Sequence, residues 1–112
     1  MKLCIVGTGY VGLVSGVCFS DIGNDVICVD NNQRKIQDLN KGIIPIYEPG
    51  LEELVKKNYK AGRLNFSTDL ENSVRNSSII FICVGTPTKK NGYSADLSQI
   101  YKVVNKIRKY IH

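Results

Sequence analysis

The sequence of 112 residues predicts an α/β fold in which helices cover a doubly wound parallel sheet. Short, continuous apolar runs alternate with segments in which apolar residues recur every three or four positions. Glycine, asparagine or proline separates most of these segments, as expected at turns. Continuous apolar runs are typical of strands buried on both faces, which is the environment of a parallel sheet with helical crossovers.

The first two elements are a strand and a helix joined by a glycine-rich turn. Lys2–Val6 is an apolar run that meets Gly7 at once. The segment from Tyr10 to Ile22 has helical periodicity, and Gly23 ends it as a left-handed cap would. The apolar stripe expected to face the sheet consists of Val11, Val14, Cys18 and Ile22.

A second strand and a second helix follow. Val26–Val29 is the strand, and Asn31 or Asn32 is expected to cap the next helix, which stops at Gly42. Residues 43–50 contain two prolines and are predicted to form an ordered loop. The order so far is the beginning of a βαβ series.

The same alternation continues to a third strand. Leu51 begins a short helix that Gly62 ends, and Leu64–Phe66 is a brief strand. Asp69 is placed to cap another short helix, which reaches about Arg75. The third strand is therefore flanked by helices on both sides in sequence.

The last predicted strand is Ile79–Val84, and a polar turn, residues 89–94, separates it from the final helix. Asp96 is expected to cap that helix, with Gln99 as its capping-box partner. The apolar stripe expected on this helix is Leu97, Ile100, Val104, Ile107 and Ile111. We expect the strand order 3-2-1-4 in one domain, 1–112, which is truncated after the helix that follows strand four and so is incomplete.

The glycine-rich turn carries the main functional signal. Residues 7–12 read Gly-Thr-Gly-Tyr-Val-Gly, a G-x-G-x-x-G pattern between a predicted strand and a predicted helix. Gly7 would allow a tight turn, Gly9 would let the backbone approach a pyrophosphate, and Gly12 would let helix and strand pack closely. The helix amino terminus would offer free N–H groups to the anion. The fold is therefore expected to be Rossmann-like and to bind a dinucleotide.

Asp30 indicates which dinucleotide is bound. It follows the second strand, eighteen residues after Gly12, where a carboxylate can accept hydrogen bonds from the adenosine ribose. The same charge would repel a 2′-phosphate, which predicts NAD rather than NADP. Arg34 and Lys35 lie nearby and could attract that phosphate, and Asp30 could instead only cap the following helix. We expect NAD because Asp30 itself occupies the ribose-reading position.

Gly85 and Thr86 follow the fourth strand. Strands one and four flank the point where the strand order reverses, and open α/β sheets bind ligands there. Thr86 can therefore donate a hydrogen bond to the cofactor, or it can belong to a turn that Pro87 stabilises. The sequence alone leaves these two readings open.

The composition argues against nucleic-acid-binding, membrane and metal-binding classes of protein. The net charge of +5 reflects dispersed basic residues, so no nucleic-acid partner is expected. No apolar run approaches the roughly 20 residues that span a bilayer, and we expect no membrane partner and a cytoplasmic protein. No cysteine pair has C-x-x-C spacing, which argues against a metal site. The four cysteines, Cys4, Cys18, Cys28 and Cys83, are expected to be buried and inert.

Several blocks resemble the UDP-glucose/GDP-mannose dehydrogenase family. These are residues 1–14 with the glycine motif, Val29-Asp30, Pro45–Leu54 (Pro-Ile-Tyr-Glu-Pro-Gly-Leu-Glu-Glu-Leu), Val84–Thr88 and Ala95–Ser98. The 45–54 block is the most specific and looks most like the UDP-glucose branch. The turn Lys89–Gly92 resembles the GDP-mannose branch.

The resemblance implies roles for individual residues. Val11 would lie against the cofactor near the pyrophosphate, Asp30 and Lys35 would hold the adenosine ribose, and Thr86 would contact the cofactor. For the 45–54 block it implies no definite chemistry, and a packing or loop-shaping role is expected. The candidate cofactor-binding residues are Gly7, Gly9, Tyr10, Val11, Gly12, Asp30, Lys35, Gly85 and Thr86.

Members of this family oxidise the C6 alcohol of a sugar nucleotide to a carboxylate in two NAD-dependent steps, through a cysteine thiohemiacetal and thioester. The resemblance implies that the parent protein oxidises UDP-glucose to UDP-glucuronate and is a homo-oligomer. The catalytic cysteine, its supporting lysine and asparagine, and the sugar-nucleotide domain would lie beyond residue 112, so this chain alone is expected to be inactive. Two alternatives remain: GDP-mannose or a UDP-N-acetylhexosamine as substrate, or a non-catalytic NAD-binding regulatory module.

Overall fold

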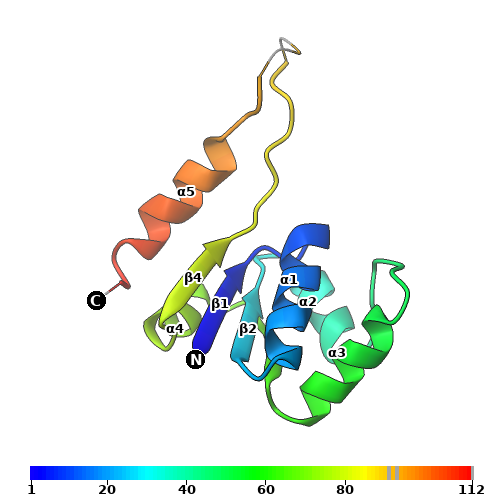
Figure 1. The fold of residues 1–112 in the computed structure, drawn as a ribbon. Coiled ribbons are helices and arrows are strands. Elements are labelled where there is room, and N and C mark those ends of the chain that lie inside the picture. The colour runs from blue at the N-terminus through cyan, green and yellow to red at the C-terminus, as the bar shows by residue number, and fades with distance from the viewer. Residues whose placement is uncertain (91, 93, 112) are drawn as a thin grey trace.

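A computed structural model, which describes residues 1–90, 92 and 94–111, contains a parallel sheet of four strands (Figure 1). The strands are β1 (Lys2–Val6), β2 (Asp25–Val29), β3 (Leu64–Ser67) and β4 (Ile79–Ile82). Their order is β3-β2-β1-β4, as the sequence predicts. The polar turn predicted at 89–94 includes Asn91 and Tyr93, which lie outside the described residues.

The register of the sheet brings three strand ends to one edge. Val6, the last residue of β1, pairs with Val29 at the end of β2 and with Ile82 at the end of β4. Because the strands are parallel, the segments that leave them start side by side at this carboxyl edge. Residues 7, 30 and 83 therefore follow neighbouring strand ends.

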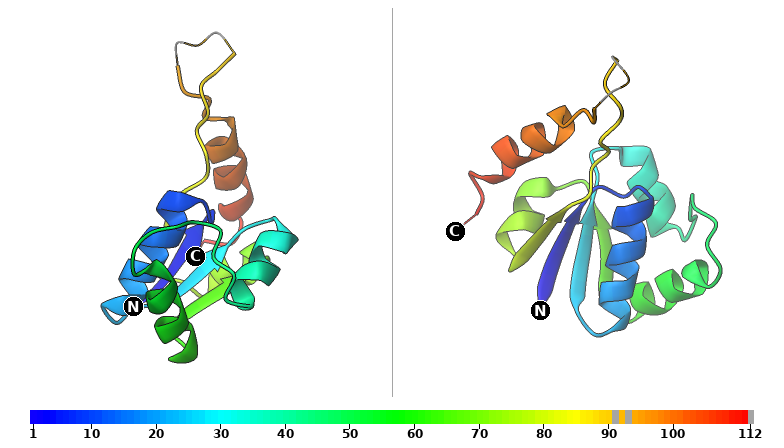
Figure 2. Two further views of the ribbon diagram at one scale, coloured as in Figure 1. Left: turned by 90° about the vertical axis from the view of Figure 1, so that its right-hand side faces the viewer. Right: turned by 45° about the horizontal axis from the view of Figure 1, so that its top comes forward.

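Five helices cover the two faces of the sheet. They are α1 (Tyr10–Asp21), α2 (Gln33–Asn40), α3 (Leu51–Lys60), α4 (Leu70–Arg75) and α5 (Ser98–Ile107). Figure 2 shows α1, α2 and α3 on one face and α4 and α5 on the other. Two apolar clusters correspond to these two faces.

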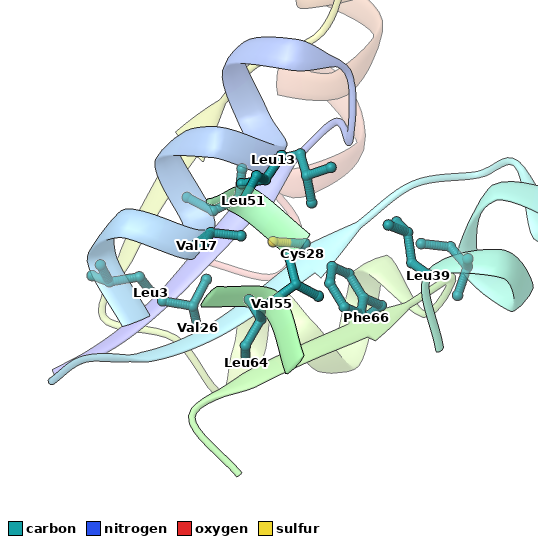
Figure 3. Close-up of a cluster of buried hydrophobic side chains, with 12 residues drawn as sticks. Leu3, Leu13, Val17, Val26, Cys28, Leu39, Leu51, Val55, Leu64 and Phe66 are labelled. Carbon is teal, nitrogen blue, oxygen red and sulfur yellow. The ribbon is translucent and has the colours of Figure 1, made fainter. Parts of the chain in front are cut away.

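The larger cluster lies between the sheet and the first three helices (Figure 3). Leu13 and Val17 of α1 and Val55 of α3 are almost completely buried against Cys28 and Leu64 of the sheet. Burial of each such side chain contributes about 1.5–3 kcal/mol. This layer fixes α1, and with it the glycine turn, on the sheet.

The apolar stripe predicted on α1 is wrong at three of its four positions; Val14 alone packs against the larger core cluster. Val11 is 63% exposed and Ile22 is 77% exposed, and Cys18 is exposed as well. The buried residues are Gly12, Leu13, Gly16, Val17 and Ser20. Small residues let the helix backbone lie close to the sheet, so the buried face is not the one with the most large apolar side chains.

The final helix also differs from its prediction. Leu97 and Val104 are exposed, and of the predicted stripe only Ile107 is buried. Leu97 precedes the first helical residue and provides no side-chain cap, while the Asp96 carboxylate accepts a hydrogen bond from the Ser98 amide (2.9 Å). Helix α5 therefore rests on the sheet through a narrow contact, at the end of a long extended segment (Figure 1).

Of the two candidates for the cap of α2, Asn31 and Asn32, the structure has Asn32, and the predicted Asp69 cap of α4 is confirmed. Asn32 accepts a hydrogen bond from the Lys35 amide (3.1 Å), and Asp69 accepts one from the Asn72 amide (3.1 Å). Such caps typically contribute about 1 kcal/mol each.

In the described part of the chain, no helix is long and apolar enough to cross a membrane.

Candidate cofactor-binding site

The candidate site lies at the carboxyl edge of the sheet, where β1, β2 and β4 end. The Gly7 amide donates to the Val29 carbonyl (2.7 Å), and the Cys83 amide donates to the Val6 carbonyl (2.7 Å). These two hydrogen bonds extend the sheet by one residue on each side of β1. The glycine turn therefore starts from a fixed position between the ends of β2 and β4.

Gly7 and Gly12 are required by close contacts within the protein. Gly7 has φ +108°, and a Cβ atom there would lie 2.6 Å from the Cys83 carbonyl oxygen. A Cβ at Gly12 would lie 1.9 Å from the Gly7 carbonyl oxygen. Neither position can hold a side chain without moving the backbone, since real Cβ atoms do not approach oxygen that closely.

Gly9 is in a different environment from the other two glycines. Its φ of −71° is open to any residue, and a Cβ there would meet no protein atom within 4 Å. Gly9 is the N-cap of α1, and the first intrahelical bond runs from the Leu13 amide to the Gly9 carbonyl (2.9 Å). The amides of residues 10–12 thus remain available in the first turn. The open space in front of them suits an anion.

The Asp30 carboxylate is fixed at the same edge by three hydrogen bonds. Its Oδ2 atom accepts from the Thr8 hydroxyl (2.7 Å) and the Thr8 amide (3.1 Å), and its Oδ1 atom accepts from the Asn32 amide (3.0 Å). The Lys35 ammonium lies 4.0 Å from Oδ2. The side chain of Asp30 remains 14% exposed, so a ligand can reach it.

These contacts keep Asp30 charged. Partial burial alone would raise the pKa of this carboxyl group. The hydrogen bonds from Thr8 and Asn32, together with the Lys35 charge, outweigh that effect and lower the pKa below its ordinary value. A permanent negative charge therefore stands beside the glycine turn at neutral pH.

A contact that the sequence did not reveal links the glycine turn to the 45–54 block. The Tyr10 hydroxyl donates a hydrogen bond to Glu48 Oε2 (2.9 Å), and this bond to a carboxylate raises the pKa of Tyr10. Ile44 and Ile46 of the same loop pack against the larger core cluster. The block therefore shapes the loop beside the first turn of α1, which agrees with the role expected for it.

The β4 side of the site is more open. Gly85 and Thr86 are exposed and follow the last sheet residues of β4. The segment then rises away from the sheet toward the antiparallel bridge between Thr88 and Ala95 (Figure 1). Gly85 and Thr86 therefore lie at the start of this segment, two and three residues beyond Cys83, whose amide still bonds to the end of β1.

The described structure thus gathers most of the predicted site residues along one edge. Gly7, Gly9 and Gly12 form the turn, Tyr10 and Val11 project from the start of α1, and Asp30 with Lys35 lies on the β2 side. Gly85 and Thr86 flank the β4 side.

Sequence reasoning missed Thr8 and Glu48. Their side-chain partners, Asp30 and Tyr10, are 22 and 38 residues away, so no local pattern indicates the contacts. A hydroxyl next to a strand end that faces a carboxylate at the neighbouring strand end was the available signal for Thr8.

The cysteines also differ from expectation: Cys4 and Cys28 are buried, Cys83 is half-buried and Cys18 is exposed.

Burial raises the pKa of the Cys4 thiol to about 12, so this cysteine is not a nucleophile at neutral pH. Burial also raises the pKa of the Cys28 thiol. Among residues 1–90, 92 and 94–111, no group of three or more His, Cys, Asp or Glu side chains is placed to hold a metal ion. This edge of the sheet offers backbone amides as hydrogen-bond donors at the start of α1 and a carboxylate acceptor at Asp30.

Comparisons with known proteins all point to one dehydrogenase family. A sequence model described as the NAD binding domain of the UDP-glucose/GDP-mannose dehydrogenase family matches residues 1–112. The UDP-glucose 6-dehydrogenase of Rhizobium meliloti is 53% identical over 107 residues, which are 96% of this chain and 24% of that protein. The UDP-glucose 6-dehydrogenase YwqF of Bacillus subtilis is 50% identical over 111 residues, or 99% and 25% respectively. The chain spans about a quarter of the length of these relatives.

A solved structure shows the same fold. The crystal structure of a ternary complex of GDP-mannose dehydrogenase from Pseudomonas aeruginosa superposes with a TM-score of 0.91 at 47% sequence identity. The match covers 96% of this chain and 24% of that chain. The predicted α/β fold class is confirmed.

Proposed function

The chain belongs to the UDP-glucose/GDP-mannose dehydrogenase family, in which it is the NAD-binding domain, and from this premise we propose which of its residues hold the cofactor and which reaction they serve. The proposal rests chiefly on one observation. An uncapped helix amino terminus opens onto free space at Gly9, and a fixed carboxylate, Asp30, stands at the neighbouring strand end. A dinucleotide has a diphosphate and a ribose diol that match these two features.

The diphosphate of NAD is assigned to the first turn of α1. The amides of Tyr10, Val11 and Gly12 supply donors, and the partial positive charge of the helix end favours an anion. No side chain within the described structure caps this helix end, and its first turn carries no acidic residue. Gly9 lets the phosphate oxygens approach these amides without meeting a side chain.

The adenosine ribose is assigned to Asp30. Its carboxylate accepts hydrogen bonds from a ribose hydroxyl, and its charge repels the 2′-phosphate of NADP. Lys35 lies close enough to Asp30 to reach the same ribose. Lys35 also offsets part of the repulsion, so the preference for NAD depends on how firmly Asp30 is held.

Gly85 and Thr86 are assigned to the other side of the dinucleotide. They follow β4, across β1 from Asp30, at the point where the strand order reverses. The Thr86 hydroxyl would orient the cofactor there. When bound, NAD supplies the hydride acceptor for oxidation of an alcohol.

The whole protein that carries this chain is proposed to be a UDP-glucose 6-dehydrogenase, which oxidises UDP-glucose to UDP-glucuronate with two NAD. The support is that the two curated relatives described above are named UDP-glucose 6-dehydrogenase. GDP-mannose is the second candidate substrate, because the GDP-mannose dehydrogenase structure is 47% identical to this chain. In either case the residues of this chain bind and orient the cofactor and do not form bonds to the sugar.

Two coarser properties complete the proposal. A cytoplasmic location is supported by four free cysteines, which are usual in a reducing compartment. A homo-oligomeric parent protein is supported by exposed apolar residues outside the cofactor site, such as Ile22 at the C-cap of α1 and Ile79 of β4, which would be covered in an assembly.

The direct test is calorimetric titration of the full-length protein with NAD and with NADP. NAD should bind at least about tenfold more tightly, since a hydrogen bond to a charged group contributes about 1.5–3 kcal/mol. Tighter binding of NADP would contradict the role assigned to Asp30. Turnover assays with UDP-glucose and GDP-mannose, each at saturating NAD, would then separate the two substrates.

A further inference from the structure

Thr8 occupies one of the variable positions of the glycine motif, yet it is among the most buried polar residues of the chain. Its side chain is 1% exposed, and both its hydroxyl and its amide donate to the same oxygen of Asp30, Oδ2. The G-x-G-x-x-G pattern makes no demand on this position. The contact is therefore a feature of this chain that the motif alone does not explain.

The two carboxylate oxygens of Asp30 differ in the number of hydrogen bonds that they accept from the protein. A carboxylate has about four lone-pair sites, two on each oxygen. Oδ2 accepts two hydrogen bonds from Thr8, whereas Oδ1 accepts only the Asn32 amide (3.0 Å) within the described structure. Oδ1 thus retains room for one further donor, and the Thr8 hydroxyl determines that this oxygen is the available one.

We propose that Thr8 is a positioning residue which orients the Asp30 carboxylate so that Oδ1 receives a ribose hydroxyl of NAD, and which thereby sets the preference for NAD over NADP. This inference rests on the proposed NAD site. Thr8 itself does not touch the cofactor in this assignment, because its hydroxyl points to Oδ2. The effect of Thr8 on binding passes through Asp30.

The charge of Asp30 depends on the same contact. Partial burial favours the neutral acid, and the Thr8 hydroxyl is the strongest of the contacts that oppose it and lower the pKa of Asp30. Without that hydroxyl, the carboxylate would be freer to rotate and easier to protonate. Both changes weaken its hydrogen bond to ribose and its repulsion of a 2′-phosphate.

The experiment compares Thr8→Val, which removes the hydroxyl at nearly constant shape, with Thr8→Ser, which retains it. The full-length proteins are titrated with NAD and NADP. Thr8→Val should weaken NAD binding about fivefold and change NADP binding less than about twofold, because loss of one hydrogen bond to a charged group is felt only by the ligand that uses it. Thr8→Ser should remain close to the wild type.

A double-mutant cycle with Asp30→Asn tests whether the effect passes through the carboxylate. In the Asp30→Asn background, Thr8→Val should have no further effect on NAD binding. The proposal would be overturned if Thr8→Val reduced the affinities for NAD and NADP equally. It would also be overturned if Thr8→Val reduced NAD affinity equally in the wild-type and Asp30→Asn backgrounds. If Thr8→Val does not fold, as judged by circular dichroism, Thr8→Ala takes its place in the cycle.

A second measurement needs no cofactor. NMR titration of the Asp30 carboxyl carbon should show a higher pKa in Thr8→Val than in the wild type, and an unchanged pKa would overturn the proposal. Accordingly, NAD affinity should begin to fall at a higher pH in the variant as the pH is lowered. Failure of the wild type to bind NAD would refute the proposed function, whereas normal NAD binding that Thr8→Val leaves intact would refute only the role of Thr8.

Discussion

The two sides of the candidate site are built in different ways. On the side of β1, α1 and β2, Gly7 and Gly12 pack against backbone atoms and Asp30 is held by three hydrogen bonds. On the side of β4, Gly85 and Thr86 are exposed and belong to a segment that leaves the sheet. The first side is held by contacts within the protein, and the second has fewer such restraints.

This difference distinguishes residues that hold the site in shape from residues that would only contact the ligand. Substitutions among the buried glycines should affect folding before they affect binding. Substitutions at open positions should affect binding alone. The following predictions test that separation, in order of decreasing expected effect.

Gly12→Ala should destabilise the protein by at least about 3 kcal/mol, because the added Cβ would overlap the Gly7 carbonyl oxygen and overpacking of this kind displaces backbone. Chemical denaturation measures the free energy of unfolding. Gly9→Ala is the matched control, and its cost should stay within about 1 kcal/mol, since its Cβ meets no protein atom and only an N-cap preference is lost. Equal destabilisation by the two substitutions would contradict the steric assignment.

Gly9→Val should lower NAD affinity at least about tenfold while the protein remains folded. The valine side chain would fill the space in front of the α1 amides that is assigned to the diphosphate, and this loss corresponds to about 1.4 kcal/mol. Calorimetry measures the affinity, and thermal unfolding of the same sample confirms the fold. Unimpaired NAD binding by a folded Gly9→Val protein would remove the diphosphate from this turn.

Asp30 should make stability depend on pH in the acid range. Its pKa is lowered in the folded protein, so its stabilising contribution is present above the ordinary aspartate value of about 3.9 and is lost as the pH falls through the folded pKa. Asp30→Asn should therefore flatten the fall in unfolding free energy below about pH 5.

Thr86→Val should have the smallest effect. Loss of one neutral hydrogen bond weakens NAD binding about threefold, and an exposed residue changes stability by less than about 0.5 kcal/mol. Titration with NAD and thermal unfolding measure the two quantities. A large loss of stability would show that the β4 side is as tightly built as the glycine side.

Much of the fold was predictable because its signals are local. Apolar runs located the four strands, Asn32 and Asp69 were identified as caps from residue type, and the glycine motif located the turn from β1 into α1. The strand order followed from the alternation of strands and helices. Each of these features depends on residues that are close in sequence, so each can be recognised from the sequence alone.

The errors came from contacts between distant segments. The apolar stripe predicted on α1 included Val11 and Ile22, whereas the helix packs through Leu13 and Val17 together with Gly12 and Gly16, and the small size of the glycines carries no hydrophobic signal. The bond between Tyr10 and Glu48 likewise joins segments that no periodicity relates. The predicted site residues do lie at neighbouring strand ends, but the contacts between Thr8 and Asp30 and between Tyr10 and Glu48 were not visible in the sequence.

Gly16 and Cys28 show how closely the helix layer rests on the sheet. A Cβ atom at Gly16 would lie 2.6 Å from the Cys28 sulfur. The two positions therefore form one steric unit across the layers: a side chain at position 16 is compatible with the fold only if residue 28 becomes smaller, and a residue larger than cysteine at position 28 requires glycine at position 16. Among divergent descendants of this chain, residues 16 and 28 should consequently change together, and engineering either position alone would displace the anion-facing end of α1.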